Sequence, residues 1–176
     1  MQAEQRRIFL LCYRMLGERD EAETAAQEVF LKAYRALSRP GASDPEDPAK
    51  WLTRVAVNTC LDRLRSRRWQ FWRLRTNSAD EEFILSMAPS TEPDAEDRLF
   101  AKQITARLSE ALGKLSARQR SVFVLKHYED RSLAEIADIL KLDVGTVKAH
   151  MARALAKLRG ELRDLYLRTE GAHNRA

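Results

Sequence analysis

Apolar residues recur along this chain at intervals of three and four, and no stretch alternates apolar and polar residues as a half-buried strand does. Side chains three and four residues apart lie on one face of a helix, so this spacing predicts helices. The chain has six Gly and five Pro in 176 residues, too few for a loop-dominated or collagen-like protein. We therefore predict an all-α fold.

The first half predicts two helices before residue 38. Ile8 and Met15 belong to one apolar face, and Gly17 is a helix stop because glycine tolerates the left-handed conformation. A second helix is expected from Asp20, where Glu23 three residues later completes a capping box. Its apolar stripe comprises Ala22, Ala26, Val29, Ala33 and Leu37.

A loop over 38–47 separates these helices from a third. Asp47 is a helix cap, and Pro48 suits the first turn, where its missing N–H costs nothing. The inward residues of this helix are Leu52, Val55, Ala56, Cys60 and Leu64. Four polar residues at spacings of three and four share its outer face: Arg54, Asn58, Asp62 and Arg65. Asn is a poor helix former, so an exposed Asn58 in mid-helix indicates a role other than stability.

The second half predicts four helices. The first spans 94–113 and buries Leu99, Ile104, Leu108 and Leu112. Two capping boxes, Ser116 with Gln119 and Ser132 with Glu135, open the next two helices. Asp143 caps the last helix, whose apolar stripe is Val147, Met151, Ala154, Leu158 and Leu162.

The last two predicted helices have the plan of a helix-turn-helix: a short helix, a tight turn and a longer helix. The N-terminus of the longer helix attracts phosphate, and Thr146 adds a hydroxyl donor there. Opposite the apolar stripe lie Lys148, Ala149, Ala152, Arg153 and Lys157. Small alanines between cations allow a helix to enter the major groove, where Lys and Arg bond guanine. We predict that this face reads DNA.

Charge is unevenly distributed along the chain, whose net charge is +5. One basic block contains Arg63, Arg65, Arg67, Arg68, Arg73 and Arg75, and a second runs from Lys141 to Arg163. Acidic residues gather between them, over 80–97. Two basic segments around an acidic one suggest two surfaces for a polyanion. We predict two small helical domains, 1–74 and 94–170, joined by a flexible acidic linker over 75–93, with a tail over 171–176.

Other function classes find little support in the residues. The longest apolar run, 8–13, is far shorter than the roughly 20 residues that cross a bilayer, and no signal peptide is recognisable. Cys12 and Cys60 lie far apart in sequence, which favours reduced thiols and a cytoplasmic location. The three His lack partners at metal-ligand spacing, and no Gly-rich phosphate loop or nucleophile motif occurs. We predict a protein that is not an enzyme and that needs no metal or cofactor.

Motifs in both halves resemble one family. The strings over 115–125, 133–137, 145–148 and 153–158 look like the promoter-reading C-terminal domain of extracytoplasmic-function (ECF) sigma factors. The string over 146–150 is equally similar to LuxR-type regulators, so an autonomous LuxR-type helix-turn-helix regulator is the alternative. The strings over 20–23, 27–37 and 51–58 resemble the other sigma domain, in the right order.

The resemblance implies a subunit that binds core RNA polymerase and directs promoter-specific initiation. It assigns polymerase binding to Glu23, Gln27, Glu28, Lys32 and Arg35. It assigns melting of the −10 element, with a base flipped out of the stack, to Arg54, Asn58, Asp62 and Arg65. The −35 element would be read by Thr146, Lys148, Ala149, Ala152, Arg153 and Lys157. The resemblance also implies an anti-sigma factor, often membrane-bound, with no insertion of this chain itself into the membrane.

Overall fold

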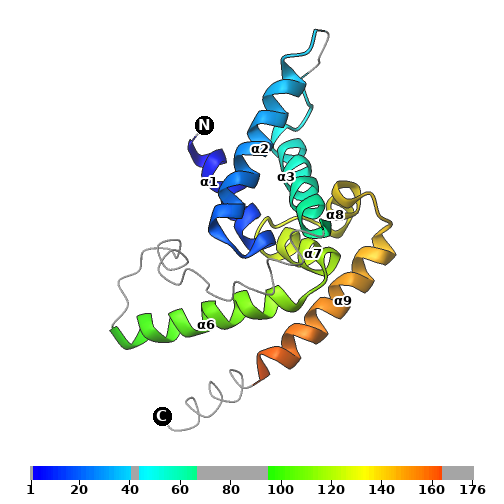
Figure 1. Cartoon of the computed structure of the whole chain (residues 1–176). Helices are drawn as coiled ribbons and strands as arrows, with labels where there is room; N and C mark the ends of the chain where they lie inside the picture. The colour runs from blue at the N-terminus through cyan, green and yellow to red at the C-terminus, as the bar shows by residue number, and fades with distance from the viewer. Residues whose placement is uncertain (1, 41–43, 67–94, 164–176) are drawn as a thin grey trace.

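The computed structural model describes residues 2–40, 44–66 and 95–163, and these ranges form helices with no strand (Figure 1). The all-α prediction is confirmed for the described residues. The helices are α1 (Gln2–Leu16), α2 (Arg19–Leu37), α3 (Pro48–Arg65), α6 (Ala95–Lys114), α7 (Ala117–His127), α8 (Leu133–Leu140) and α9 (Val144–Glu161). The predicted linker (75–93), the tail (171–176) and the basic residues from Arg67 to Arg75 lie outside the described residues, as does Leu99 with the other side chains of 95–103.

Helices α1, α2 and α3 pack against one another as a three-helix bundle. Its core is built from side chains with no exposed area, among them Ile8, Leu11, Met15, Val29 and Val57. These positions follow the helical spacing of the sequence, because each helix buries one apolar stripe against the other two.

Two details of α2 differ from prediction. The helix begins at Arg19, because the carboxylate of Glu18 accepts hydrogen bonds from the backbone N–H groups of Asp20 (3.1 Å) and Glu21 (2.9 Å). The capping box expected at Asp20 and Glu23 is therefore wrong. Leu37, expected inside, is 45% exposed, because the C-terminal end of α2 projects beyond α1 and α3 (Figure 1).

The other helix starts agree with the sequence. Asp47 caps α3 by accepting from the Lys50 amide at 2.9 Å, and Pro48 is the first helical residue. Both predicted capping boxes are present at α7 and α8, and Asp143 caps α9. Gly17 has φ +79°, the left-handed conformation that its assignment as a stop requires.

In the second half, α9 packs on α7, α8 and the end of α6. Val147, Ala154 and Leu158 are buried as predicted. Ile104, expected inside α6, is 39% exposed, so that prediction is wrong. The reason is visible in Figure 1, where α6 approaches α9 near its C-terminal end, and Leu112 is buried in a cluster there.

The two groups of helices share one apolar core. A single cluster of buried residues continues from α1–α3 into α7, α8 and α9, and contains Val122, Leu125 and Ile136 beside the residues of the first bundle. The contacts join α1 to α7 and join α3 to both α7 and α8 (Figure 1). We call this contact surface of α1 and α3 with α7 and α8 the seam. The guanidinium of buried Arg120 crosses it and donates to the Met15 carbonyl at 2.8 Å.

The fold also brings the two cysteines together. Cys12 on α1 and Cys60 on α3 are free thiols with no exposed area. A hydrogen bond between the two thiols, followed by burial, raises the pKa of Cys60 well above its ordinary value. The prediction of reduced cysteines agrees with this geometry, although their sequence separation gave no sign that they are neighbours.

Candidate nucleic-acid and polymerase interfaces

The start of α9 is held in a defined geometry. Asp143 accepts from the Thr146 backbone N–H at 2.8 Å through one carboxylate oxygen and from the Thr146 hydroxyl at 2.5 Å through the other. These bonds lower the pKa of Asp143. A Cβ added at Gly145 would lie 3.0 Å from the same carboxylate, so a larger residue would strain this turn. The predicted Thr146 hydroxyl is thus used within the protein and does not point freely to solvent.

The predicted DNA-reading face of α9 is largely open. Lys148, Ala152 and Arg153 are exposed, and Ala149 is half-buried. Lys148 and Arg153 make no ion pair with the described part of the chain. Lys157 is also exposed, but its ammonium donates to the Lys114 carbonyl at 2.7 Å. Uncompensated cations on one helix face suit the binding of phosphate and base edges.

His150 is a residue of α9 that the pattern did not assign. It is half-buried, and its Nδ1 has no hydrogen-bond partner among the described residues. Burial, followed by the charges of Arg153 and Arg118, lowers the pKa of His150. The imidazole is therefore neutral near pH 7 and adds no cation to this face.

On α3 the predicted polar line is split. Asn58, Asp62 and Arg65 are exposed, as the spacing predicted. Arg54 is not free: its Nη2 donates to the Asp138 carboxylate at 2.6 Å and to the Asp138 carbonyl at 3.4 Å. Asp138 belongs to α8, so the seam covers the Arg54 end of the line.

Asp138 is a second functional candidate that the sequence did not reveal. Its carboxylate also accepts from Lys50 on α3 at 3.0 Å and from Lys141 at 3.2 Å. The bond to Lys50, then that to Lys141 and the charge of Arg54, lower its pKa to about 2. No local signal marks it, because Arg54 and Lys50 are more than 80 residues away in sequence.

The predicted polymerase-binding residues share one face of α2, but several are engaged within the protein. Glu28 pairs with Lys32 at 2.7 Å and with Arg63 at 3.0 Å, and these contacts, that with Lys32 first, lower its pKa. Glu23 is exposed and pairs with Arg19 at 3.2 Å. Gln27 and Arg35 are exposed.

Apolar side chains accompany these polar groups on α2. Tyr34 is 70% exposed and Leu31 is 49% exposed. Solvated aromatic and aliphatic residues beside charges are typical of a protein-binding surface. The exposure of Tyr34 could have been predicted from its position one turn from Leu31 and Gln27.

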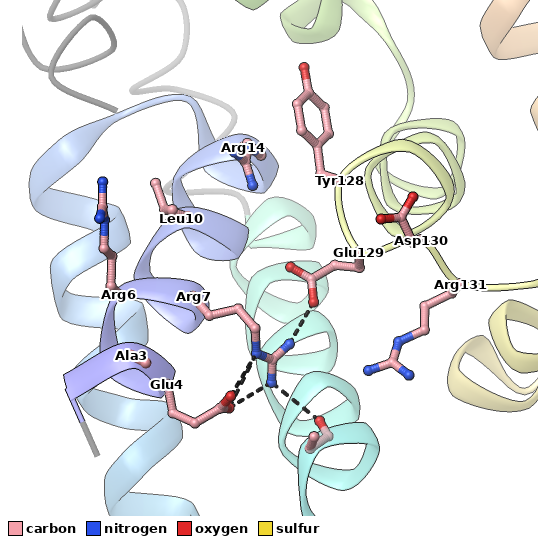
Figure 2. A pocket seen from close by; sticks show the side chains of 11 residues that line it. Ala3, Glu4, Arg6, Arg7, Leu10, Arg14, Tyr128, Glu129, Asp130 and Arg131 are labelled. Carbon is pink, nitrogen blue, oxygen red and sulfur yellow. Dashed lines mark hydrogen bonds and ion pairs between the residues drawn. The ribbon is translucent and has the colours of Figure 1, made fainter. Parts of the chain in front are cut away.

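A crevice of about 650 Å³ opens on the seam between α1 and the turn after α7 (Figure 2). Arg7 lies at its floor and donates to Glu4 (2.9 Å), Thr53 (2.9 Å) and Glu129 (2.5 Å). The Glu129 side chain is only 5% exposed. The Arg14 guanidinium lies 4.2 Å from the centre of the Tyr128 ring, a cation–π contact between the two halves.

Neither a metal centre nor a membrane span emerges from the described residues. No three His, Cys, Asp or Glu side chains gather there as a metal site would require. No described helix has the length and apolar character needed to cross a membrane.

Comparison with known proteins identifies the family. The family model described as "Sigma-70 region 2" matches residues 1–70, and "Sigma-70, region 4" matches residues 105–158. The "ECF RNA polymerase sigma factor SigW" of Bacillus subtilis is 36% identical over 162 residues, which cover 90% of this chain and 84% of that protein. The chain belongs to the ECF sigma factors.

Solved structures agree with this sigma factor fold. The structure titled "Structure of CnrH in complex with the cytosolic domain of CnrY" matches with a TM-score of 0.58 and 25% identity, over 89% of this chain and 81% of that one. The sigma factor RpoE from Bartonella quintana, solved with the anti-sigma factor NepR, matches with a TM-score of 0.57 and 18% identity, over 92% and 93% of the two chains.

The family resemblance predicted from the motifs is therefore confirmed, and the protein is a promoter-directing ECF sigma factor. The LuxR-type alternative is not supported, because the first half of the chain matches sigma region 2.

Proposed function

We propose that the two halves of this sigma factor divide promoter recognition between them. Residues 1–74 bind core RNA polymerase and the −10 element, residues 94–170 read the −35 element, and residues 75–93 link the two. The observation that carries this proposal is the match to region 2 and region 4 models in this order along one chain.

Reading of the −35 duplex falls to α9. Lys148 and Arg153 bond phosphates or guanine edges, Ala149 and Ala152 let the helix backbone approach the groove, and Lys157 adds charge farther along. The exposure of Lys148, Ala152 and Arg153 supports this role. Thr146 acts through the capped geometry of the helix N-terminus, with its backbone N–H held by Asp143.

Melting of the −10 element falls to α3. Separating strands costs a few kcal/mol, and a flipped base needs polar partners and nearby positive charge. Asn58, Asp62 and Arg65 supply hydrogen-bonding groups and one cation on an exposed face. Arg54 joins this line when it is released from Asp138.

Polymerase docking falls to α2, through Glu23, Gln27, Glu28, Lys32 and Arg35. The exposed Tyr34 and Leu31 extend the polar face with apolar area of the kind that stabilises protein interfaces.

An anti-sigma factor is the further protein partner that we propose. Both solved relatives described above were crystallised as complexes, one with a named anti-sigma factor and one with the cytosolic domain of CnrY. We propose that the chain works in the cytoplasm, that it does not insert into the membrane, and that it performs no chemistry of its own. A pull-down with the tagged chain, followed by mass spectrometry, identifies the partner.

Transcription with purified bacterial core polymerase on genomic DNA, with transcript starts mapped by sequencing, tests the function. We expect starts preceded by a shared pair of elements near −10 and −35. Absence of specific starts, together with failure to co-purify with polymerase, would refute the proposal. Gln27→Ala with Arg35→Ala should weaken co-purification, while Lys148→Ala with Arg153→Ala should leave it intact and reduce specific starts.

A further inference from the structure

We propose that the seam is an autoinhibitory contact, in which α8 of the second half covers part of the DNA-melting face of α3 and Asp138 occupies the place of a DNA phosphate on Arg54. This inference rests on the proposed role of α3 in −10 binding. It concerns the chain by itself, before any partner, polymerase or promoter is bound.

The first support is the size of the closed body. A compact chain of this length has a radius of gyration of about 16 Å, and hence a diameter of about 40 Å. The −10 and −35 elements are separated by about 25 base pairs, which at 3.4 Å each is roughly 85 Å. With the seam closed, α3 and α9 belong to one body that cannot reach both elements, so promoter binding requires the seam to open.

The second support is the nature of the seam. It buries apolar side chains from both halves in one cluster, including Leu11, Val57, Leu125 and Ile136. Buried polar groups across it are satisfied: Arg120 reaches the Met15 carbonyl, and Arg7 joins Glu129 to Thr53. Apolar burial with paired polar groups is typical of a specific interface and stabilises the closed arrangement.

The third support is the contact at Asp138. Its carboxylate lies 2.6 Å from Arg54 and 3.0 Å from Lys50. A carboxylate beside a guanidinium offers the same planar, charge-assisted acceptor as a phosphate does. A strand of DNA that binds Arg54 must therefore displace Asp138, which couples promoter binding to separation of the seam.

The coupling acts in both directions. Any ligand that binds the open chain better than the closed one shifts the population toward the open chain. Polymerase and promoter do this by binding the separated halves, whereas a partner that grips both halves favours the closed chain. Free sigma factor in the closed state is thus protected from binding single-stranded DNA at random sites.

A reversible cross-link across the seam tests the proposal in the full chain. Lys50→Cys with Asp138→Cys replaces an ion pair that spans the seam, and Lys114→Cys with Glu161→Cys replaces one, at 2.6 Å, within the second half. Cys12 and Cys60 are fully buried, so a disulfide-containing bismaleimide labels the introduced thiols selectively. Initiation is measured with core polymerase on a mapped promoter, before and after reduction.

We expect the cross-link across the seam to reduce initiation at least tenfold and reduction to restore it, while the control cross-link has no effect. Full initiation by the seam-linked chain would overturn the autoinhibitory contact. Failure of the wild-type chain to initiate at all would refute the proposed function instead, so the two failures are distinguishable.

A second measurement addresses Asp138 alone. Binding of a fluorescent 12-nucleotide single strand to the full chain is followed by anisotropy for wild type, Asp138→Asn and Glu110→Gln. The last variant removes an equal charge from α6, away from the seam, where Glu110 is exposed. We expect Asp138→Asn to bind two- to fivefold more tightly and Glu110→Gln to match wild type. Equal affinity of all three proteins would show that Asp138 does not compete for the melting face.

Discussion

The salt dependence of promoter binding is the property for which the structure gives the clearest number. Lys148 and Arg153 are exposed cations on α9, and neither is neutralised by an acid in the described part of the chain. Each cation that contacts a duplex phosphate releases counterions and contributes about 0.9 to the slope of log K against log salt. Lys148→Ala and Arg153→Ala should each flatten the slope by about that amount.

The expected magnitude follows from this slope. Raising salt from about 50 to about 200 mM weakens binding about 3.5-fold for each phosphate contact. The ratio of wild-type to double-variant affinity should therefore fall about twelvefold over that range. Lys157 should contribute less, because its ammonium already donates to the Lys114 carbonyl.

The assay is titration of a fluorescent promoter duplex with holoenzyme at four salt concentrations, at low temperature so that the strands stay paired. Lys126→Ala is the matched control, because it removes an exposed cation from α7 in the same half. Identical slopes for the double variant and wild type would refute the assignment of this α9 face to DNA. A flattened slope for Lys126→Ala alone would move the DNA-binding surface to α7.

Three further predictions concern α3 and the seam. Asn58→Ala should slow strand opening, read by a fluorescent base analogue in the −10 element, more than it weakens the closed complex; equal losses would indicate a folding role. Glu129→Gln should lower the free energy of unfolding in urea by about 1–3 kcal/mol, because the nearly buried carboxylate loses its charge-assisted bond to Arg7, whereas Glu110→Gln should change it by less than about 0.5 kcal/mol; similar values for both would argue against the seam contact. The pKa of Asp138 is about 2 in the folded chain, below the ordinary 3.8, so its stabilisation is complete above about pH 5 and is lost as the pH falls from about 4 toward 2. The difference in urea midpoint between wild type and Asp138→Asn should therefore stay constant from pH 8 to 5 and shrink below pH 4, and a change between pH 5 and 8 would contradict this origin.

Predictions based on one turn of helix succeeded where the interaction is local. The capping boxes at Ser116 and Ser132 join residues three apart, so both partners are visible in a short string. The cap at Glu18 was missed because a Glu carboxylate reached the N–H groups that were assigned to Asp20. Ile104 was misplaced because periodicity identifies an apolar face but not whether a neighbour covers it.

The candidate DNA-binding face of α9 was predictable for the same reason. Lys148, Ala152 and Arg153 lie opposite the buried stripe of one amphipathic helix, and that geometry follows from the helical repeat. The α3 line was predictable as a line, but the occupation of Arg54 was not.

The sequence by itself determined the helices, most of their caps, the helix-turn-helix and the family, since all of these are written in spacings of a few residues and in local motifs. Tertiary structure alone decided that Cys12 meets Cys60, that Arg7 joins Glu129 across 122 residues, and that Asp138 covers Arg54 across 84. Such pairs depend on which helix faces pack together. That choice is made by burial of a shared apolar core, which is non-directional and leaves no mark in the spacing of any single segment.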